Sequence, residues 1–309
     1  MKNIMQAFMK TWVAACHFKG RARVLIPPGV YALGPLIFAG PCIGPSPIIV
    51  QVSGTLKGDT DISLYEEPAW FQFENIDGLI VTGGGAFDGQ GESAWKYNDC
   101  KNNNDCVQLP SNIKLNKVSN AILRGFTSAD SKGVHIFITN SQNIRLKRLH
   151  IVAPGDSPNT DGVHISTSIN VKVSKTIIAT GDDCIDNGIR IKTWPGSTPS
   201  LATGMIFQDL VMDNVRNPII IDQGYCPSGC KKQPSRVKIS NIQYINIRGT
   251  SSSEVGVNLM CSPQYQCENI HLFNINLKHI GNGPITATCA NARVSTFGGL
   301  QSPRVTCHN

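Results

Sequence analysis

The chain has 309 residues, which is enough to bury a hydrophobic core in one large domain or in two small ones. Its hydrophobic content of 41% is ordinary for a globular protein, and no stretch approaches the ~20 uninterrupted apolar residues of a membrane helix. The net charge of +7 suits a polyanionic partner. Because the basic residues are scattered and no nucleic-acid-binding motif is present, an anionic polysaccharide fits this charge at least as well as a nucleic acid. We therefore expect no membrane span and no nucleic-acid partner.

The N-terminal segment is predicted to form a short amphipathic helix. Ile4, Phe8, Trp12 and Val13 recur at helical spacing and fall on one stripe. The segment is too polar to supply the apolar region of a signal peptide, so we expect that a signal peptide is absent from this chain.

From about residue 72 onward the chain returns to one pattern, in which a polar turn with Asn or Ser leads into short runs of Ile and Val. Asn120, Asn143 and Asn170 mark three such turns, at intervals in the twenties. This period predicts an all-β solenoid, and leucine is too sparse for leucine-rich repeats. No linker divides the chain, so we expect a single domain over residues 1–309.

Two kinds of residue have expected positions in this solenoid, one in the turns and one in the core. The turn asparagines are expected to adopt left-handed backbone conformations. The alternating apolar residues of the runs are expected to fill the core, namely Ile144, Leu146, Val171, Val173, Ile177 and Ile178.

Two acidic triplets, Asn159-Thr160-Asp161 and Gly181-Asp182-Asp183, are separated by about one coil. Such spacing places them on neighbouring rungs, roughly 4.8 Å apart. Asp and Asn are common in turns, which explains either triplet alone. Three carboxylates on one face repel each other, however, and acid–base chemistry on a sugar requires such a cluster. Together with Arg190-Ile191-Lys192, the pair of triplets predicts a catalytic site.

The eleven cysteines include three pairs of close neighbours, 100/106, 226/230 and 261/267, in loop-like stretches where a disulfide would close a small ring. Zinc is the rival interpretation, but these spacings lack a well-spaced histidine pair. Oxidised loops indicate the secretory pathway. The odd number leaves one cysteine without a partner.

A series of short motifs extends over nearly the whole chain, and it comprises Arg23-Val24-Leu25-Ile26-Pro27, Gly40-Pro41-Cys42, Gly83-Gly84-Gly85-Ala86-Phe87-Asp88-Gly89-Gln90-Gly91, Ser157-Pro158-Asn159-Thr160-Asp161-Gly162, Thr180-Gly181-Asp182-Asp183-Cys184, Arg190-Ile191-Lys192 and Asn217-Pro218-Ile219-Ile220-Ile221-Asp222-Gln223. With these motifs the chain resembles the plant polygalacturonases of glycoside hydrolase family 28. The resemblance implies a right-handed parallel β-helix with a short N-terminal capping helix, which cleaves the α-1,4-galacturonan of pectin by inversion. It also implies a secreted, monomeric enzyme of the cell wall that uses no metal and no other cofactor.

The resemblance assigns roles to individual residues. Asp182 matches the acid that protonates the leaving oxygen, while Asp161 and Asp183 match the residues that orient and deprotonate water. The substrate-binding residues implied in the same way are Asn159, Arg190, Lys192 and Tyr225. A calcium-dependent lyase is the rival reaction, in which the aspartates would form a metal cluster.

One departure from the family pattern is large. Family members carry a Gly-His-Gly motif about one coil beyond the aspartate pair, whereas here Asp183 is followed almost directly by Arg190. Roughly 45–50 residues, or about two coils, are absent. Neither His135 nor His164 obviously replaces the lost histidine. The alternative to an active enzyme is therefore an inactive pectin-binding relative, produced by truncation, splicing or an imperfect gene prediction.

The resemblance also implies the disulfide pairing, because the family partner of Cys184 falls in the absent segment. We therefore expect Cys184 to be a free thiol. The remaining ten cysteines are expected to pair as Cys16–Cys42, Cys100–Cys106, Cys226–Cys230, Cys261–Cys267 and Cys289–Cys307.

Overall fold

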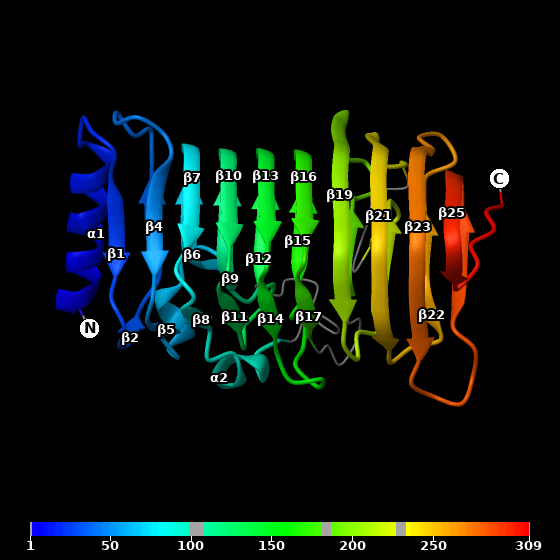
Figure 1. Ribbon diagram of the computed structural model, residues 1–309, viewed down its shortest axis with the longest axis horizontal. Helices are drawn as coiled ribbons and strands as arrows, with labels where there is room; N and C mark the ends of the chain where they lie inside the picture. The colour runs from blue at the N-terminus through cyan, green and yellow to red at the C-terminus, as the bar shows by residue number, and fades with distance from the viewer. Residues whose placement is uncertain (1, 99–107, 181–186, 227–232, 309) are drawn as a thin grey trace.

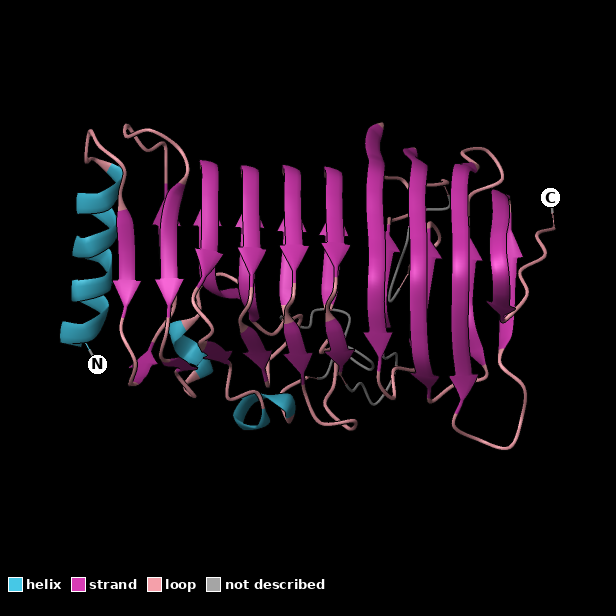
Figure 2. Cartoon of the chain, viewed as in Figure 1, coloured by secondary structure: helices cyan, strands magenta, loops and turns pink. Residues whose placement is uncertain are grey.

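The chain is wound into a parallel β-helix, seen here in a computed structural model that describes residues 2–98, 108–180, 187–226 and 233–308. The strands of successive coils stack side by side along one long axis, with the N-terminus at one end and the C-terminus at the other (Figure 1). Within these described ranges all strand pairs are parallel, and they form one sheet of 16 strands and one of nine. Strands run through the whole length, whereas the helices of the described residues lie at the N-terminal end and in two loops (Figure 2). The fold class predicted from the sequence is confirmed.

Each of the first six coils contributes two strands to the larger sheet. The first strands of these coils are β1 (Arg23–Ile26), β4 (Ile48–Val52), β7 (Asp77–Thr82), β10 (Ser119–Arg124), β13 (Gln142–Lys147) and β16 (Ile169–Ser174). The second strands are β2 (Val30–Leu33), β5 (Thr55–Gly58), β8 (Ala86–Asp88), β11 (Thr127–Ala129), β14 (His150–Val152) and β17 (Ile177–Ala179). In later coils one long strand replaces both, and these long strands are β19 (Ser200–Met212), β21 (Val237–Ser251), β23 (Cys267–His279) and β25 (Ala292–Ser302).

The smaller sheet receives one strand from each coil up to the ninth. Its strands are β3 (Leu36–Ala39), β6 (Ala69–Glu74), β9 (Ser111–Asn116), β12 (Ile136–Thr139), β15 (Val163–Ser166), β18 (Asn187–Lys192), β20 (Asn217–Asp222), β22 (Val255–Met260) and β24 (Thr286–Ala290). A short 3-10 helix, η1 (Ile62–Leu64), and a single helical turn, α2 (Glu92–Trp95), lie in the loops that precede β6 and β9.

The predicted N-terminal helix is α1 (Lys2–Cys16), and it covers the open end of the first coil (Figure 1). The Trp12 ring stacks on Phe38 with 4.5 Å between ring centroids, and its Nε1 donates a hydrogen bond to the Ala39 carbonyl at 2.9 Å. Not every residue of the predicted stripe faces the coil, because Ile4 and Val13 are exposed. Among the described residues, no helix is long and apolar enough to cross a membrane.

The interior of the coil is filled by apolar side chains that alternate with outward-facing residues along each strand. Five of the six predicted core residues are fully buried, namely Ile144, Leu146, Val171, Val173 and Ile178. The prediction for Ile177 was wrong, because its side chain is 44% exposed. Ile177 and Ile178 are adjacent in a strand, so they must point to opposite faces, and only Ile178 points inward.

The turn asparagines form a hydrogen-bonded ladder along the outside of the coil. Asn120, Asn143 and Asn170 have φ angles of 55°, 56° and 54°, as predicted. The Asn143 amide donates to the Asn120 side-chain oxygen at 3.0 Å, and the Asn170 amide donates to Asn143 at 3.1 Å. Asparagine tolerates this backbone conformation better than other non-glycine residues. Each asparagine therefore closes its own turn and binds the next coil.

Three of the five predicted disulfides are present, namely Cys16–Cys42, Cys261–Cys267 and Cys289–Cys307. Cys226 is also disulfide-bonded. The predictions for Cys184, for the Cys100–Cys106 pair and for Cys230 as the partner of Cys226 concern residues outside the described ranges.

The sheet is continuous at the place where about two coils were predicted to be absent. Strand β18 pairs with β15 on one side and with β20 on the other. His164 faces Arg190 across the first pairing, and Ile220 faces Arg190 across the second. The segments before and after the predicted break therefore meet in register.

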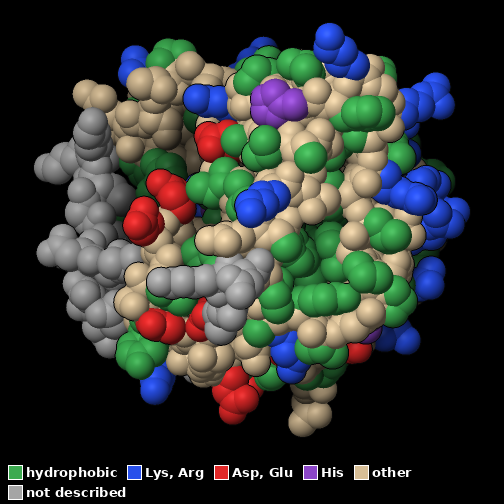
Figure 3. Space-filling model, turned by 90° about the vertical axis from the view of Figure 1, so that its left-hand side faces the viewer, with side chains coloured by type: hydrophobic (Ala, Val, Ile, Leu, Met, Phe, Trp, Pro, Cys, Tyr) green, Lys and Arg blue, Asp and Glu red, His purple; other side chains and the backbone are tan. Residues whose placement is uncertain are grey.

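Charged side chains are distributed unevenly around the circumference. Viewed along the long axis from the end that carries α1, Lys and Arg side chains project mainly along one edge of the outline, while Asp and Glu gather near the opposite edge (Figure 3). Seen from this end, positive and negative side chains therefore project mainly on different sides of the coil (Figure 3).

The asparagine ladder can be tested at its middle member. Replacing Asn143→Ala removes two ladder hydrogen bonds and places a side chain with a Cβ but no polar group in the left-handed conformation, so we expect the free energy of unfolding to fall by about 1–3 kcal/mol. Asn143→Gly tolerates the backbone and loses only the hydrogen bonds, so it should lose less. Urea unfolding followed by circular dichroism measures both. An Asn143→Ala protein as stable as the wild type would contradict a stabilising ladder.

Candidate functional site

The outer face of β18 carries the basic residues that the sequence singled out. Arg190 and Lys192 alternate along the strand with Ile189 and Ile191, and the two isoleucines are buried in the core. Because successive side chains of a strand point to opposite faces, the two cations share the outer face of the smaller sheet. The alternation of apolar and basic residues in β18 thus determines that the two cations lie on the outer face.

A buried ion pair joins this strand to the previous coil. Asp161 lies at the end of the loop that leads into β15, and its Oδ2 is 3.3 Å from Arg190 Nη1. Asp161 is only 4% exposed and Arg190 only 3%. Burial by itself lowers the pKa of Arg190, but the Asp161 carboxylate and Tyr225 outweigh it and raise that pKa above its ordinary value. Breaking such a pair would leave an uncompensated buried charge, so the two side chains hold each other in place.

Aromatic rings cover the two cations. The Tyr225 ring centroid lies 4.4 Å from Arg190 Cζ and 4.3 Å from Lys192 Nζ. Trp194 packs edge-on against Tyr225 with 5.0 Å between ring centroids, and Lys192 Nζ lies 5.6 Å from the Trp194 ring. Trp194 is 42% exposed, so one aromatic surface of this group remains open to solvent. A cation pair beside an open aromatic ring can bind the carboxylate and the apolar face of an acidic sugar.

Lys192 has an altered protonation equilibrium. Burial, followed by the nearby charge of Arg190, lowers the pKa of Lys192 to about 8, and Asp161 and Asp222 oppose this shift only in part. The ammonium group is thus positive at neutral and acidic pH and loses its proton near pH 8. Its positive charge is available where an acidic sugar is ionised.

His164 belongs to this group, although the sequence analysis did not assign it a role. It occupies the outer face of β15, directly beside Arg190, and its ring lies 4.7 Å from the ring of Phe137. Burial, followed by the charges of Lys192 and Arg190, lowers the pKa of His164 well below its ordinary value, so the imidazole is neutral at physiological pH. The separation of about one coil from Arg190 could have revealed this neighbour.

The structure brings together Asp161, Arg190, Lys192 and Tyr225 from the predicted set. Asn159 lies two residues before Asp161 with a φ angle of 55°, and its exposed side chain donates to Asn98 Oδ1 at 3.0 Å. Asp182 and Asp183 lie outside the described residues.

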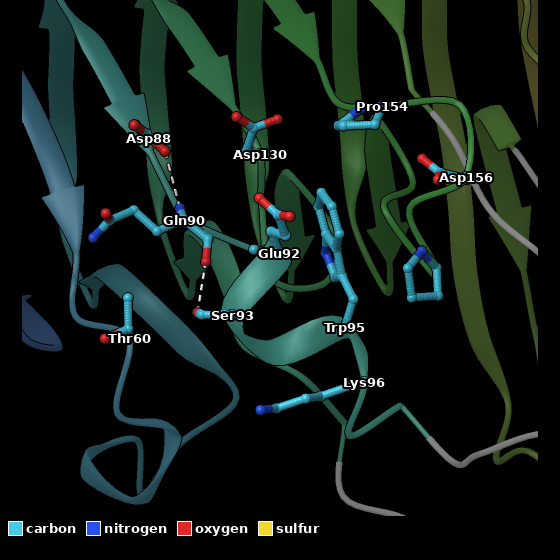
Figure 4. A pocket seen from close by; sticks show the side chains of 12 residues that line it. Thr60, Asp88, Gln90, Glu92, Ser93, Trp95, Lys96, Asp130, Pro154 and Asp156 are labelled. Atoms are coloured by element: carbon cyan, nitrogen blue, oxygen red, sulfur yellow. Dashed lines mark hydrogen bonds between the residues drawn. The ribbon is translucent and has the colours of Figure 1, made fainter.

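A cleft of about 680 Å³ opens beside the loop that carries Asn159 and Asp161. Figure 4 shows its carboxylates, Asp88, Glu92, Asp130 and Asp156, together with Trp95 of α2. The sequence analysis assigned no role to these residues, because the loops that bring them together have different lengths and no shared motif.

The cleft carboxylates interact through their charges. Burial, followed by the negative charges of Asp88 and Glu92, raises the pKa of Asp130, while Lys57 opposes the shift. Lys57 Nζ also lies 3.5 Å from Asp88 Oδ2. Within the described ranges, no three His, Cys, Asp or Glu side chains are grouped closely enough to hold a metal ion.

Curated relatives from plants match nearly the whole chain. An exopolygalacturonase of Platanus acerifolia is 40% identical, and the alignment covers 99% of this chain and 94% of that protein. An exopolygalacturonase of Oenothera organensis is 38% identical, with 97% of both chains covered. A polygalacturonase of Gossypium barbadense is 36% identical, over 96% of this chain and 85% of that protein.

Solved structures share the fold at low sequence identity. An endo-xylogalacturonan hydrolase from Aspergillus tubingensis superposes with a TM-score of 0.66 at 17% identity, covering 98% of this chain and 95% of that chain. A polygalacturonase from Erwinia carotovora gives a TM-score of 0.59 at 20% identity, with 94% and 93% covered.

The alignments also locate an interruption. The Platanus alignment extends over 357 positions, whereas this chain has 309 residues, so the alignment contains positions of that relative that this chain does not fill. The sequence model of glycosyl hydrolases family 28 matches in two segments, residues 16–186 and 185–298, which meet where the absent coils were predicted. Because these segments and the plant relatives cover nearly the whole chain, the chain belongs to glycosyl hydrolases family 28.

Proposed function

We propose that this chain hydrolyses the α-1,4-galacturonan of pectin with inversion at the anomeric carbon. The observation that carries the proposal is the buried Asp161–Arg190 pair, with Lys192 and Tyr225 beside it. This arrangement combines a carboxylate for acid–base chemistry with cations for a uronate. The names of the plant relatives, exopolygalacturonase and polygalacturonase, agree with this substrate.

The proposed reaction divides the work between three carboxylates. Asp182 protonates the oxygen of the leaving sugar, and Asp161 and Asp183 orient and deprotonate the attacking water. An inverting enzyme needs about 6.5–9.5 Å between acid and base to admit this water. Asp161 precedes β15, and the Asp182–Asp183 segment precedes β18, the strand paired with β15. In this scheme the proton that the acid must donate is kept on Asp182 by its acidic neighbour Asp183.

Substrate binding is assigned to the cations and aromatic rings of β18 and the loop after β20. Arg190 and Lys192 attract the carboxylate of the sugar, and Tyr225 fixes both cations by its ring. Asn159 supplies an amide at the rim of the same loop as Asp161. His164 lies beside Arg190 on the neighbouring strand and, because it is neutral, adds no positive charge to the site.

A second candidate function is the binding of pectin with little turnover. It is favoured by the contact of 3.3 Å between Arg190 and Asp161, because a carboxylate engaged by a guanidinium is less available to water. The interruption in the family match at residues 185–186 favours it as well. A missing acid–base group typically reduces a rate by a factor of roughly 10²–10⁴.

The remaining proposals concern the molecule as a whole. We propose a single domain over residues 1–309 that acts as a monomer, without a cofactor and without nucleic-acid or membrane partners. Three disulfides among the described residues favour an oxidising compartment, which supports secretion to the cell wall.

Catalysis is tested by the release of reducing ends from polygalacturonate. Asp182→Asn keeps the shape of the side chain but cannot protonate the leaving oxygen, so we expect the rate to fall roughly 10²–10⁴-fold. Asp213→Asn is the matched control, because this exposed aspartate lies at the end of β19 and should leave the rate unchanged. Equal rates for Asp182→Asn and wild type would show that this site does not catalyse, and would favour the binding function.

The type of reaction is tested with a chelator. Hydrolysis by carboxylates needs no metal, so we expect activity on polygalacturonate to persist in EDTA and the product to show no absorbance of an unsaturated sugar. Loss of activity in EDTA that calcium restores would instead establish a calcium-dependent lyase.

The role of Lys192 is tested by the pH dependence of binding. Because its pKa is lowered to about 8, the ammonium is charged below that pH and neutral above it, so affinity for galacturonate oligomers should fall as pH rises through 8. Calorimetry in the Asp182→Asn background measures binding without turnover. Lys192→Arg keeps its charge over this range, and its affinity should stay level. A fall of the same size in Lys192→Arg would rule out Lys192 as its source.

A further inference from the structure

A second cluster of cations lies far around the coil from the proposed site. It occupies the outer face of β10, β13 and β16 and the turns that follow β13 and β16, on the near side in Figure 1. We call it the basic panel, and it consists of Arg124, Arg145, Lys147, Arg148, Lys172 and Lys175. Lys172 is half-buried and the other five are exposed.

The strand register places these cations side by side. Arg124 pairs with Lys147 across β10 and β13, and Arg145 pairs with Lys172 across β13 and β16. Neighbouring strands are about 4.8 Å apart, so each pair brings two positive charges close together. Like charges at directly opposed positions destabilise a sheet. Folding alone therefore gives no reason for this arrangement.

Acidic residues do not compensate the basic panel. No Asp or Glu occurs in residues 119–129, 142–152 or 169–179, and no panel residue forms an ion pair within the described chain. Each of the two flanking strands, β7 and β19, carries one acid, and both acids accept hydrogen bonds from groups outside the panel. Asp77 accepts hydrogen bonds from Ser119 and Asn120, and Asp209 accepts one from Asn246. Within the described chain, the charges of the panel are therefore not paired with any carboxylate.

A groove of about 340 Å³ runs along one border of the panel. Arg148 and Lys175 line it together with His150, and Ile177 contributes an exposed apolar surface. Arg148 and Lys175 occupy equivalent turn positions with φ angles of 54° and 53°, where the preceding coil has Gly125. Glycine adopts this conformation at lower cost than a side chain that carries a Cβ. The backbone conformation of this turn therefore does not explain why Arg148 and Lys175 occupy it.

We propose that the basic panel is a second binding site for galacturonan, separate from the site that cleaves it. The proposal takes its ligand from the proposed function, and rests on it for the choice of polyanion. A polymer that carries one carboxylate per sugar matches a two-dimensional array of cations, and the groove offers an apolar surface for a sugar ring. The short strands β14 and β17 separate the groove from the loops of the proposed site. A chain held on the panel would keep the enzyme attached to its polymer between cleavage events.

The test compares two variants with equal loss of charge, both made in the Asp182→Asn background. The panel variant replaces four cations by glutamine, as Arg145→Gln, Lys147→Gln, Arg148→Gln and Lys172→Gln. The control variant replaces four exposed cations elsewhere, as Lys10→Gln, Lys19→Gln, Arg21→Gln and Lys278→Gln. Circular dichroism verifies that both fold. Affinity electrophoresis through polygalacturonate, with fully methyl-esterified pectin as the uncharged comparison, measures binding at low salt.

We expect the panel variant to bind polygalacturonate at least about tenfold more weakly than its parent, with little change in the control variant. Equal affinities for the two variants would overturn the proposal, as would duplex DNA that competes as well as polygalacturonate, since the panel would then be a general polyanion surface. This binding readout does not depend on catalysis, so it decides the proposal even if the wild type releases no reducing ends.

With catalytic Asp182 restored, the panel variant should cleave trigalacturonate at the wild-type rate and show a higher KM only on the long polymer. An equal loss on both substrates would place the panel residues in the cleaving site and contradict a separate one.

Discussion

The structure depends on the parallel backbone hydrogen bonding between successive coils. This ladder fixes the coils about 4.8 Å apart, so residues one coil apart in the sequence become lateral neighbours in space. The asparagine ladder, the aligned core residues and the pairing of His164 with Arg190 all follow from that rule. Side chains that repel each other, such as Arg145 and Lys172, are brought together by the same bonds. The strand register therefore determines which side chains become neighbours on this fold, and the loops contribute further residues around them.

The proposed site shows how register and burial act together. Asp161 and Arg190 come from neighbouring coils, and their contact is possible only because β15 and β18 are paired directly. In a chain with further coils between them, the two residues could not meet in this way. The ion pair is then extended by Tyr225, which joins Arg190 and Lys192 through its ring. One aromatic residue thus couples the buried charges to the solvent-exposed Trp194.

Features that repeat were predictable from the sequence, and features that depend on one loop were not. The period identified the coil, the left-handed asparagines and the residues of β13 and β16 that fill the core. It could not determine which of Ile177 and Ile178 faces inward, because a strand of three residues is too short to define its own alternation. The helical stripe likewise included Ile4 and Val13, since spacing alone does not show which side of a helix meets the first coil.

The acidic cleft escaped prediction for a related reason. Asp88 ends a second strand, and Asp130 and Asp156 follow the next two, but the loops after these strands differ in length and have no common motif. His164 could have been predicted, because its separation from Arg190 in the sequence is close to the length of one coil.

The unbroken pairing of β15 with β18 has a consequence for how such chains change in evolution. A segment that spans whole coils can be lost while the two cut surfaces still match, since every coil presents the same hydrogen-bonding edge to its neighbour. A loss of half a coil would instead bring the two sheets out of alignment and turn core side chains toward solvent. Natural length variants of this fold are therefore expected to differ by whole numbers of coils, so that the period of the fold becomes the unit of insertion and deletion.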